Sequence, residues 1–180
     1  MRKLQSTNEI ELEWRSFLLR PRPALEPRSL EEFRTYTESW RRCDAEEPDA
    51  GFRVWSTDNG PPTHSIPPHL VAKAAARISA EGFEDLHARL LDAYFRRNLD
   101  ITDCDVLLDL WKQSGLPAAD FDQREDPSLL EDVLNQHQEA VQHGASGVPA
   151  VRVEGHFGVL MGAQPVEIYS RWLEKLGALQ

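Results

Sequence analysis

The chain has 180 residues, of which 41% are hydrophobic and 28% are charged, as expected for one globular domain or one domain with a sizeable insertion. Its net charge is −10, and residues 91–140 contain 12 Asp and Glu against 4 Lys and Arg. Such an acidic surface repels a phosphate backbone, so we expect no nucleic acid partner. No apolar run approaches the roughly 20 residues that cross a bilayer, so we expect no membrane partner.

The two cysteines, Cys43 and Cys104, lie far apart in the sequence and do not form the pattern of a disulfide framework. The N-terminal residues lack the apolar core of a secretory signal. Few cysteines and no signal are typical of a reducing compartment, so we predict a cytoplasmic location.

The first third of the chain predicts a strand, a helix and a loop. Residues Ile10–Trp14 alternate apolar and charged side chains, as a strand with one buried face does. Ser29 and Glu32 have the spacing of a capping box, which predicts a helix from about Leu30 to Arg42. Residues 43–68 are rich in Asp, Glu, Gly and Pro, which predicts a loop.

The loop contains two prolines and a tryptophan that lead to further predictions. Pro67 and Pro68 are expected to keep helix out of its final residues. Trp55, flanked by polar residues, either packs onto the core or lines a cleft, and we favour packing onto the core.

Residues 69–144 have the apolar spacing of successive helices. Thr102 and Asp105 have capping-box spacing, with Asp in place of Glu, and predict a helix that ends at Gly115. A later helix opens at Asp126-Pro127. Its predicted inward positions are Leu130, Val133, Leu134, His137 and Val141.

The last third predicts a hairpin followed by a helix. Val151 and Val153 indicate a strand, Glu154-Gly155 a two-residue turn, and Val159–Met161 the return strand. Pro165 fits the first turn of the final helix, and Gly177 fits its end. A proline at the entry of the first strand, Pro149, is unusual because it lacks the N–H of a ladder residue, and a cis peptide bond would be one solution.

The run Gly147-Val148-Pro149, together with Gly162-Ala163-Gln164-Pro165, resembles the closing half of a DsbA-family thioredoxin domain. This group includes FrnE-like proteins and 2-hydroxychromene-2-carboxylate isomerases. Residues 13–21 are similar to the family's second strand and the loop after it, and residues 93–103 to its helical insertion. The resemblance implies an α/β thioredoxin-like fold with an all-helical insertion between the second and third family strands. Residues 1–66 and 144–180 would form the thioredoxin-like domain, and residues 67–143 the insertion.

The same resemblance implies a substrate-binding site at Val148 and Pro149. In this family the proline is cis, and the backbone of the residue before it pairs with an extended substrate. The alternative is that Pro149 has a purely architectural role.

The sequence departs from the family pattern at its start. Family members open with a strand and a helix whose first turn carries Cys-x-x-Cys, or a single Ser or Cys, whereas only Met1 to Asn8 precede the second-strand segment here and no Cys-x-x-Cys occurs. The sequence therefore predicts an N-terminally incomplete thioredoxin-like domain and leaves the catalytic residue unknown.

Other reactive side chains do not replace this motif. Cys104 falls in the first turn of a predicted helix, which favours a thiolate, but Asp103 and Asp105 flank it and disfavour one. We therefore interpret Cys104, and also Cys43, as small, partly buried residues without a chemical role. The six histidines have no metal-ligand spacing, so no metal site is predicted.

Three functions remain open from the sequence. The first, favoured by resemblance, is a thiol–disulfide oxidoreductase acting on a thiol-containing peptide or small molecule, with its nucleophile on a segment before Met1. The second is an isomerase or transferase that takes glutathione as co-substrate, with no other cofactor. The third is a non-catalytic binding protein. Without the family's first strand, the sheet would expose open edges, which predicts a homodimer or an obligate complex.

Overall fold

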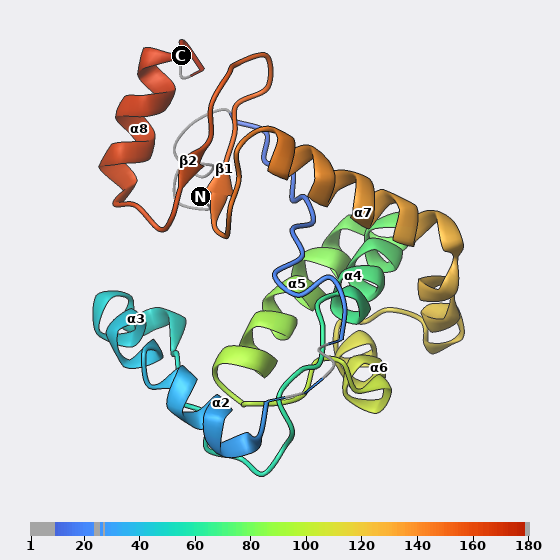
Figure 1. The fold of residues 1–180 in the computed structure, drawn as a ribbon. Coiled ribbons are helices and arrows are strands. Elements are labelled where there is room, and N and C mark those ends of the chain that lie inside the picture. Colours follow the sequence, from blue (N-terminus) through green and yellow to red (C-terminus); the bar gives the residue numbers. More distant parts are fainter. Residues whose placement is uncertain (1–9, 24–25, 27, 179–180) are drawn as a thin grey trace. The chain divides into compact units, whose positions relative to one another are not determined.

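The computed structural model describes residues 10–23, 26 and 28–178. Figure 1 follows the chain from its first described residues to the C-terminal helix. The elements are α2 (Leu30–Thr37), α3 (Trp40–Glu46), η1 (Pro48–Ala50), α4 (Ile66–Ile78), α5 (Ala80–Phe95), α6 (Cys104–Gln113), η2 (Ala118–Glu125), α7 (Pro127–Gln142), β1 (Ala150–Val151), β2 (Leu160–Met161) and α8 (Val166–Lys175).

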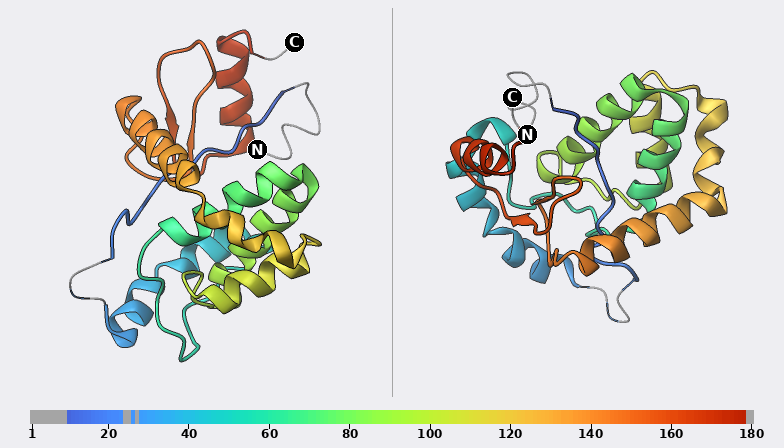
Figure 2. Two further views of the ribbon diagram at one scale, coloured as in Figure 1. Left: turned by 90° about the vertical axis from the view of Figure 1, so that its right-hand side faces the viewer. Right: turned by 90° about the horizontal axis from the view of Figure 1, so that it is seen from above.

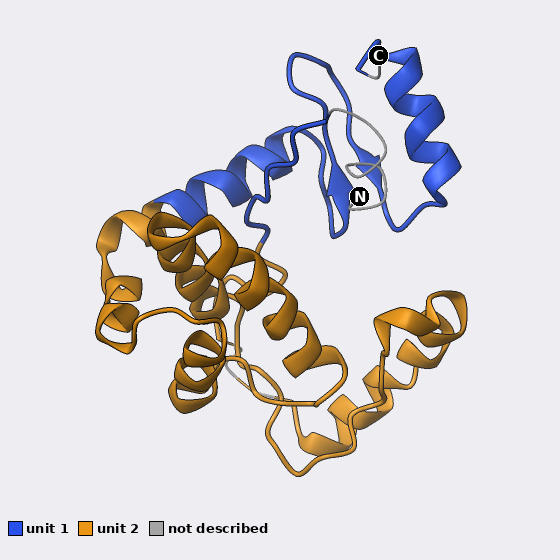
Figure 3. Cartoon of the chain, turned by 180° about the vertical axis from the view of Figure 1, so that it is seen from behind, with its two compact units in different colours: residues 1–17, 132–180 blue, residues 18–131 orange. Residues whose placement is uncertain are grey.

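The chain divides into two compact units, coloured separately in Figure 3. Residues 1–17 and 132–180 form one, here called the hairpin unit, and residues 18–131 form the other, the helical unit. This grouping by contacts puts residues 18–66 with the helices. It does not test the family-based domain boundaries, which stay a prediction.

The helical unit has an apolar core formed mainly by α4, α5 and α6. Val71, Ala74 and Ala75 of α4 are fully buried, as their helical spacing predicts. Leu86 of α5 and Trp111 of α6 are equally buried in the same cluster. This core supports the walls of the pocket described below.

A second cluster in the helical unit is aromatic and has Trp55 at its centre. Trp55 is 1% exposed. Its ring lies 5.0 Å from that of Phe33 and 5.8 Å from that of Tyr94. Its Nε1 donates a hydrogen bond of 3.0 Å to the carbonyl of Asn59. The interpretation that Trp55 packs onto the core is confirmed.

The capping box at Ser29 is present, but the single helix predicted to Arg42 is wrong. The backbone N–H of Glu32 donates to Ser29 Oγ at 3.2 Å. The helix then breaks between α2 and α3, where hydroxyls compete with the backbone ladder. Thr37 Oγ1 donates to the carbonyl of Arg34 at 2.9 Å, and Ser39 Oγ to that of Tyr36 at 3.0 Å.

Two other predicted helix starts need correction. Pro67 and Pro68 do not exclude helix, because they occupy the first turn of α4, where a proline's missing N–H has no intrahelical partner to lose. The cap of α6 is Asp103 rather than Thr102. Asp103 Oδ1 accepts from the backbone N–H of Asp105 at 2.8 Å, whereas the Thr102 hydroxyl donates to Asp100 at 2.6 Å.

Helix α7 has a narrower buried stripe than the sequence predicts. Leu129 and Val133, four residues apart, are 1% and 0% exposed and mark the buried direction of the helix. Leu130, Leu134 and Val141 were expected to point inward, but they are 38%, 43% and 51% exposed. The prediction is wrong for these three residues because apolar residues at the margins of the buried face recur with the same helical spacing as the residues at its centre.

The hairpin unit contains a short antiparallel pair, β1 and β2. The turn at Glu154-Gly155 is confirmed, since Gly155 has φ +74° and His156 N–H donates to the carbonyl of Val153 at 3.1 Å. A two-residue hairpin would pair Val151 with Gly158, but Val151 instead lies opposite Leu160. The return strand is therefore displaced by two residues, and Gly158 (φ +99°) lies within the displaced segment.

Helix α8 covers this pair, and the two lie side by side in both views of Figure 2. Tyr169 and Leu173 are its buried residues. Val151, Leu160 and Ile10 pack against them. Gly177, in the left-handed region at φ +66°, follows the helix end as predicted.

Residues 10–13 alternate in exposure, but the prediction that Ile10–Trp14 form a strand is wrong. Ile10 and Leu12 are partly buried, while Glu11 and Glu13 are exposed. Among the described residues, however, β1 and β2 pair only with each other. The alternation therefore reflects one-sided burial without membership in a ladder, and Ser16 N–H just beyond it donates to Gln136 Oε1 of α7 at 2.8 Å.

Candidate functional site

The loop before β1 contains a cis peptide bond between Val148 and Pro149. This geometry, implied by the family resemblance, is confirmed. The carbonyl of Pro149 accepts a hydrogen bond of 2.8 Å from the N–H of Gly162. Val148 is 52% exposed, so this residue is open to solvent.

The register of the pair decides which backbone groups of β1 are available. Pro149 lies opposite Gly162 and bonds to it, and Val151 lies opposite Leu160. Hydrogen-bonded pairs alternate with non-bonded pairs in an antiparallel ladder, so Ala150 opposite Met161 is a non-bonded pair. The N–H and C=O of Ala150 therefore face the outer edge of β1. This edge has no neighbouring strand within the described part of the chain.

A buried tyrosine connects α8 to this loop. Tyr169 is 6% exposed, and its hydroxyl donates a 2.9 Å hydrogen bond to the carbonyl of Gly162. Gly162, at φ +78°, in turn donates to Pro149. Gln164 Nε2 donates to the carbonyl of Met161 at 3.0 Å. The end of β2 is thus fixed by two side chains.

A cluster of charges around Glu139 fastens the hairpin unit together. Arg15 Nη2 lies 2.7 Å from Glu139 Oε2, and Arg152 Nη1 lies 3.3 Å from Oε1. His143, just beyond the end of α7, lies 3.8 Å from Glu139 Oε1. The two arginines and Glu139 are about one third exposed or more, so each Arg–Glu pair contributes about 0.2–1 kcal/mol. Their role is to hold α7, the residue-15 segment and the segment after β1 in register.

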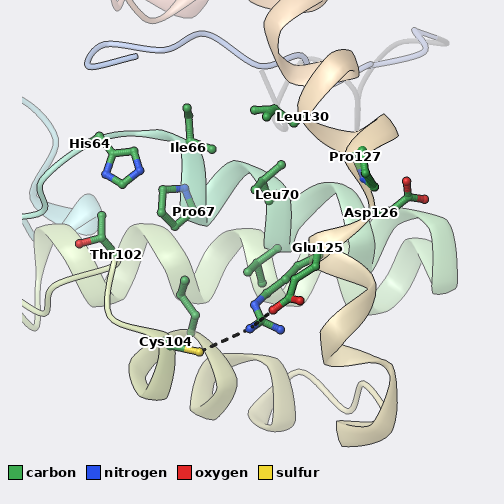
Figure 4. Close-up of a pocket in the computed structure, with 13 residues that line it drawn as sticks. His64, Ile66, Pro67, Leu70, Thr102, Cys104, Glu125, Asp126, Pro127 and Leu130 are labelled. Carbon is green, nitrogen blue, oxygen red and sulfur yellow. Dashed lines mark hydrogen bonds and ion pairs between the residues drawn. The ribbon is translucent and has the colours of Figure 1, made fainter. Parts of the chain in front are cut away.

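The helical unit contains a pocket of about 510 Å³, shown in Figure 4. Exposed Cys104, at the start of α6, forms part of its wall. The Cys104 sulfur accepts a hydrogen bond of 3.7 Å from Arg124 Nη2. The lining residues are His64, Ile66, Pro67, Leu70, Val71, Thr102, Cys104, Leu107, Arg124, Glu125, Asp126, Pro127 and Leu130.

The charges at this pocket are largely paired within it. Arg124 lies 2.8 Å from Asp122 and 2.9 Å from Glu125. The guanidinium also stacks over the Phe121 ring at 4.1 Å. The backbone and hydroxyl of Ser128, with a further contribution from Arg77, hold the pKa of Asp126 below its usual value. Asp126 is therefore ionised at neutral pH.

A family model for the DSBA-like thioredoxin domain matches residues 1–174 of the chain. The chain belongs to this family. No sequence of a curated protein matches it significantly.

Solved structures agree on the fold of this DSBA-like domain. A candidate protein disulfide isomerase from Nitrosomonas europaea has a TM-score of 0.68 at 18% identity, covering 86% of this chain and 80% of its own. The cytosolic disulfide reductase DsbM from Pseudomonas aeruginosa has a TM-score of 0.63 at 22% identity, covering 84% and 77%. A DsbM structure with GSH has a TM-score of 0.52 at 24% identity, covering 67% and 60%.

In this DSBA-like domain Val148 and Pro149, the two predicted site residues, lie directly before β1, whose outer edge has no neighbouring strand among the described residues. Their role in binding stays a prediction. The hairpin unit contains no cysteine, since Cys43 and Cys104 both belong to the helical unit. Among the described residues, no three His, Cys, Asp or Glu side chains gather to hold a metal ion. No helix in the same residues is long and apolar enough to span a membrane.

Sequence reasoning missed Arg124 and the pocket of the DSBA-like domain. The lining residues come from segments between residues 64 and 130, and no spacing pattern links them. The nearest signal is Cys104 at a predicted helix start. The interpretation of Cys104 as partly buried is wrong, because this thiol is exposed. Its exposure, its place in the pocket wall and its contact with Arg124, 20 residues further along the chain, distinguish it from Cys43.

Proposed function

We propose that this DSBA-like domain takes part in thiol–disulfide exchange, and that its cis-proline loop holds the backbone of an extended thiol substrate. The observation that carries the proposal is the open edge of β1 at Ala150, directly after the cis bond at Val148–Pro149. Family membership supports the type of chemistry.

The substrate class follows from the edge. An extended peptide adds to an exposed strand through main-chain hydrogen bonds, and side-chain contacts then supply specificity. We propose glutathione or a thiol-containing peptide as the substrate. A protein of similar fold, solved with GSH and named a cytosolic disulfide reductase, supports glutathione, the reductive direction and a cytoplasmic setting.

The thiol–disulfide exchange step requires no metal and no organic cofactor, because the bonds formed and broken balance between the sulfur atoms. A thiolate attacks one sulfur of a disulfide, a new S–S bond forms, and the other sulfur leaves as a thiolate. The described residues of the loop supply positioning for this step and no nucleophile, so the attacking group is left unassigned.

The test uses two proline substitutions at residues that face each other across the pair. Ala150→Pro removes the N–H on the outer edge of β1, whereas Met161→Pro removes the N–H on the opposite edge, and neither N–H takes part in the ladder. We expect Ala150→Pro to raise the glutathione Kd at least tenfold and Met161→Pro to leave it within twofold. The Kd is measured by NMR titration of the full chain.

Exchange is measured separately, by mass spectrometry of a glutathione–peptide mixed disulfide incubated with the full chain and reduced glutathione. Accelerated exchange that Ala150→Pro reduces would support the proposal. Binding without exchange would favour the alternative of a non-catalytic binding protein. Equal effects of the two proline substitutions would contradict the role of the β1 edge.

A further inference from the structure

The pocket of the helical unit is large enough for a small organic molecule. Small-molecule sites are typically about 300–1,000 Å³, and this one is about 510 Å³. Its walls are mainly apolar, with Ile66, Pro67 and Leu70 from α4 and Leu130 from α7 drawn around the cavity in Figure 4. Leu107, 2% exposed, joins this wall to the packed core, so the wall is held in place without a ligand.

The charges at the pocket disfavour an anion. Arg124 is the only Lys or Arg among the lining residues of the described chain, and two carboxylates, on Asp122 and Glu125, already balance it. Asp126 adds a further carboxylate to the lining, and Arg77, outside the lining, pairs with it at 2.8 Å. An anionic ligand would meet more negative than positive charge there, whereas a neutral ligand would meet no such repulsion.

The polar groups of the wall also have partners of their own. Cys104 accepts from Arg124, and the Thr102 hydroxyl donates to Asp100 at 2.6 Å. His64 Nδ1 lies 2.9 Å from the hydroxyl of Thr63. A ligand therefore needs no charged group to satisfy the wall, and apolar contact is what the cavity offers it.

We propose that this pocket is a binding site for a neutral, largely apolar small molecule, and that the bound molecule covers Cys104. An apolar cavity of about 150 Å³ holds one benzene, so two fused aromatic rings fit comfortably. The site belongs to the helical unit and does not depend on thiol exchange at the cis-proline loop.

The experiment uses a matched pair of probes with the same ring system. 1-Naphthol is neutral at pH 7, and 1-naphthoate is its anionic counterpart. The readout is alkylation of Cys104 by iodoacetamide in the full chain, followed by peptide mass spectrometry. Cys43, a partly buried thiol on α3 outside the pocket, is the internal control. We expect saturating 1-naphthol to slow alkylation of Cys104 at least tenfold and that of Cys43 by less than twofold, and 1-naphthoate to protect Cys104 much less.

Two variants separate the pocket from general apolar binding. Leu130→Asp puts a charge in the wall, and Leu134→Asp makes the same change one turn along α7, outside the lining, at a similarly exposed leucine. Protection should be lost in the first and kept in the second, with circular dichroism unchanged in both. Four outcomes would each overturn the proposal. 1-Naphthol could protect both cysteines equally or protect neither. The two probes could protect Cys104 equally, or protection could survive Leu130→Asp. Because the glutathione titration does not involve Leu130, failure here would leave the proposed function intact.

Discussion

At the scale of single residues, the cis-proline loop depends on a hydroxyl that lies on another element. Tyr169 of α8 donates to the carbonyl of Gly162, and Gly162 donates to the carbonyl of Pro149. Tyr169 is buried and the bond is partly buried, so removing the hydroxyl takes away a protein partner of the Gly162 carbonyl. The strand edge is therefore held partly by a side chain whose sequence position suggests only core packing.

Replacing Tyr169 with Phe should lower the free energy of unfolding by about 1 kcal/mol, since one partly buried hydrogen bond is lost while the ring stays. Tyr36→Phe is the control, because Tyr36 is 50% exposed and stacks on Phe33 through its ring. Urea unfolding of both variants checks the difference. If the two variants lose equal stability, the bond from Tyr169 to Gly162 does not contribute as described.

The buried phenol of Tyr94 predicts that the stability of the fold depends on pH in the alkaline range. Burial, opposed by the charges of Arg20 and Arg28, raises the pKa of Tyr94 to about 12. The unfolded chain ionises this phenol near pH 10 while the folded chain keeps it protonated, so stability falls as the pH rises from about 10 to about 12. Two pKa units correspond to about 2–3 kcal/mol. In Tyr94→Phe this part of the decline should be absent from urea midpoints measured between pH 9 and pH 12. An unchanged profile would contradict it.

At the scale of elements, local hydrogen bonds decide where the helices begin. The side chains of Ser29, Ser79 and Asp103 cap α2, α5 and α6, each accepting from a backbone N–H in the first turn. Each such cap contributes about 1 kcal/mol. For α6 the sequence pattern pointed one residue too early, at Thr102.

The two positions can be separated by substitution. Asp103→Ala should expose the N–H groups of Asp105 and Val106, speed their hydrogen exchange, and lower stability by about 1 kcal/mol. Thr102→Ala removes a hydroxyl that contacts Asp100 and should leave those two amides protected. NMR-detected hydrogen exchange distinguishes the outcomes. If the amides of Asp105 and Val106 instead exchanged faster in Thr102→Ala, Thr102 would be the cap of α6.

At the scale of the whole molecule, the chain consists of two units that are stabilised by different kinds of contact. The helical unit has two apolar clusters, one built mainly by α4, α5 and α6 and the other around the loop residue Trp55. The hairpin unit rests on one short strand pair, covered by α8 and tied by the Glu139 cluster. An unpaired strand edge invites pairing with another chain.

The open edge of β1 therefore predicts self-association. We expect the protein to form a homodimer through the edge at Ala150, and glutathione to compete with it. Light scattering after size-exclusion chromatography should give twice the mass of the single chain, and Ala150→Pro should shift it to one chain. A stable monomer of the unmodified protein at all concentrations would contradict this prediction.

The family and the type of fold could be predicted from the resemblance of short motifs to known proteins, and many element positions could be predicted from local chemistry. Gly-Val-Pro before Ala150, the capping box at Ser29 and the stop at Gly177 are short-range signals, and the structure agrees with each. Apolar spacing also identified the buried face of α4. Such patterns suffice where a residue's conformation depends on neighbours a few positions away.

Tertiary structure decided the features that need partners distant in the sequence. Ile10–Trp14 has the alternation of a strand, but a strand exists only with a hydrogen-bonded neighbour, and the structure provides none among the described residues. The displaced register of Val151 against Leu160 depends on packing that a turn sequence does not encode. The pocket joins residues up to 66 positions apart, from His64 to Leu130. Such contacts depend on how the helices pack on each other, so the spacing of residues along the sequence does not predict them.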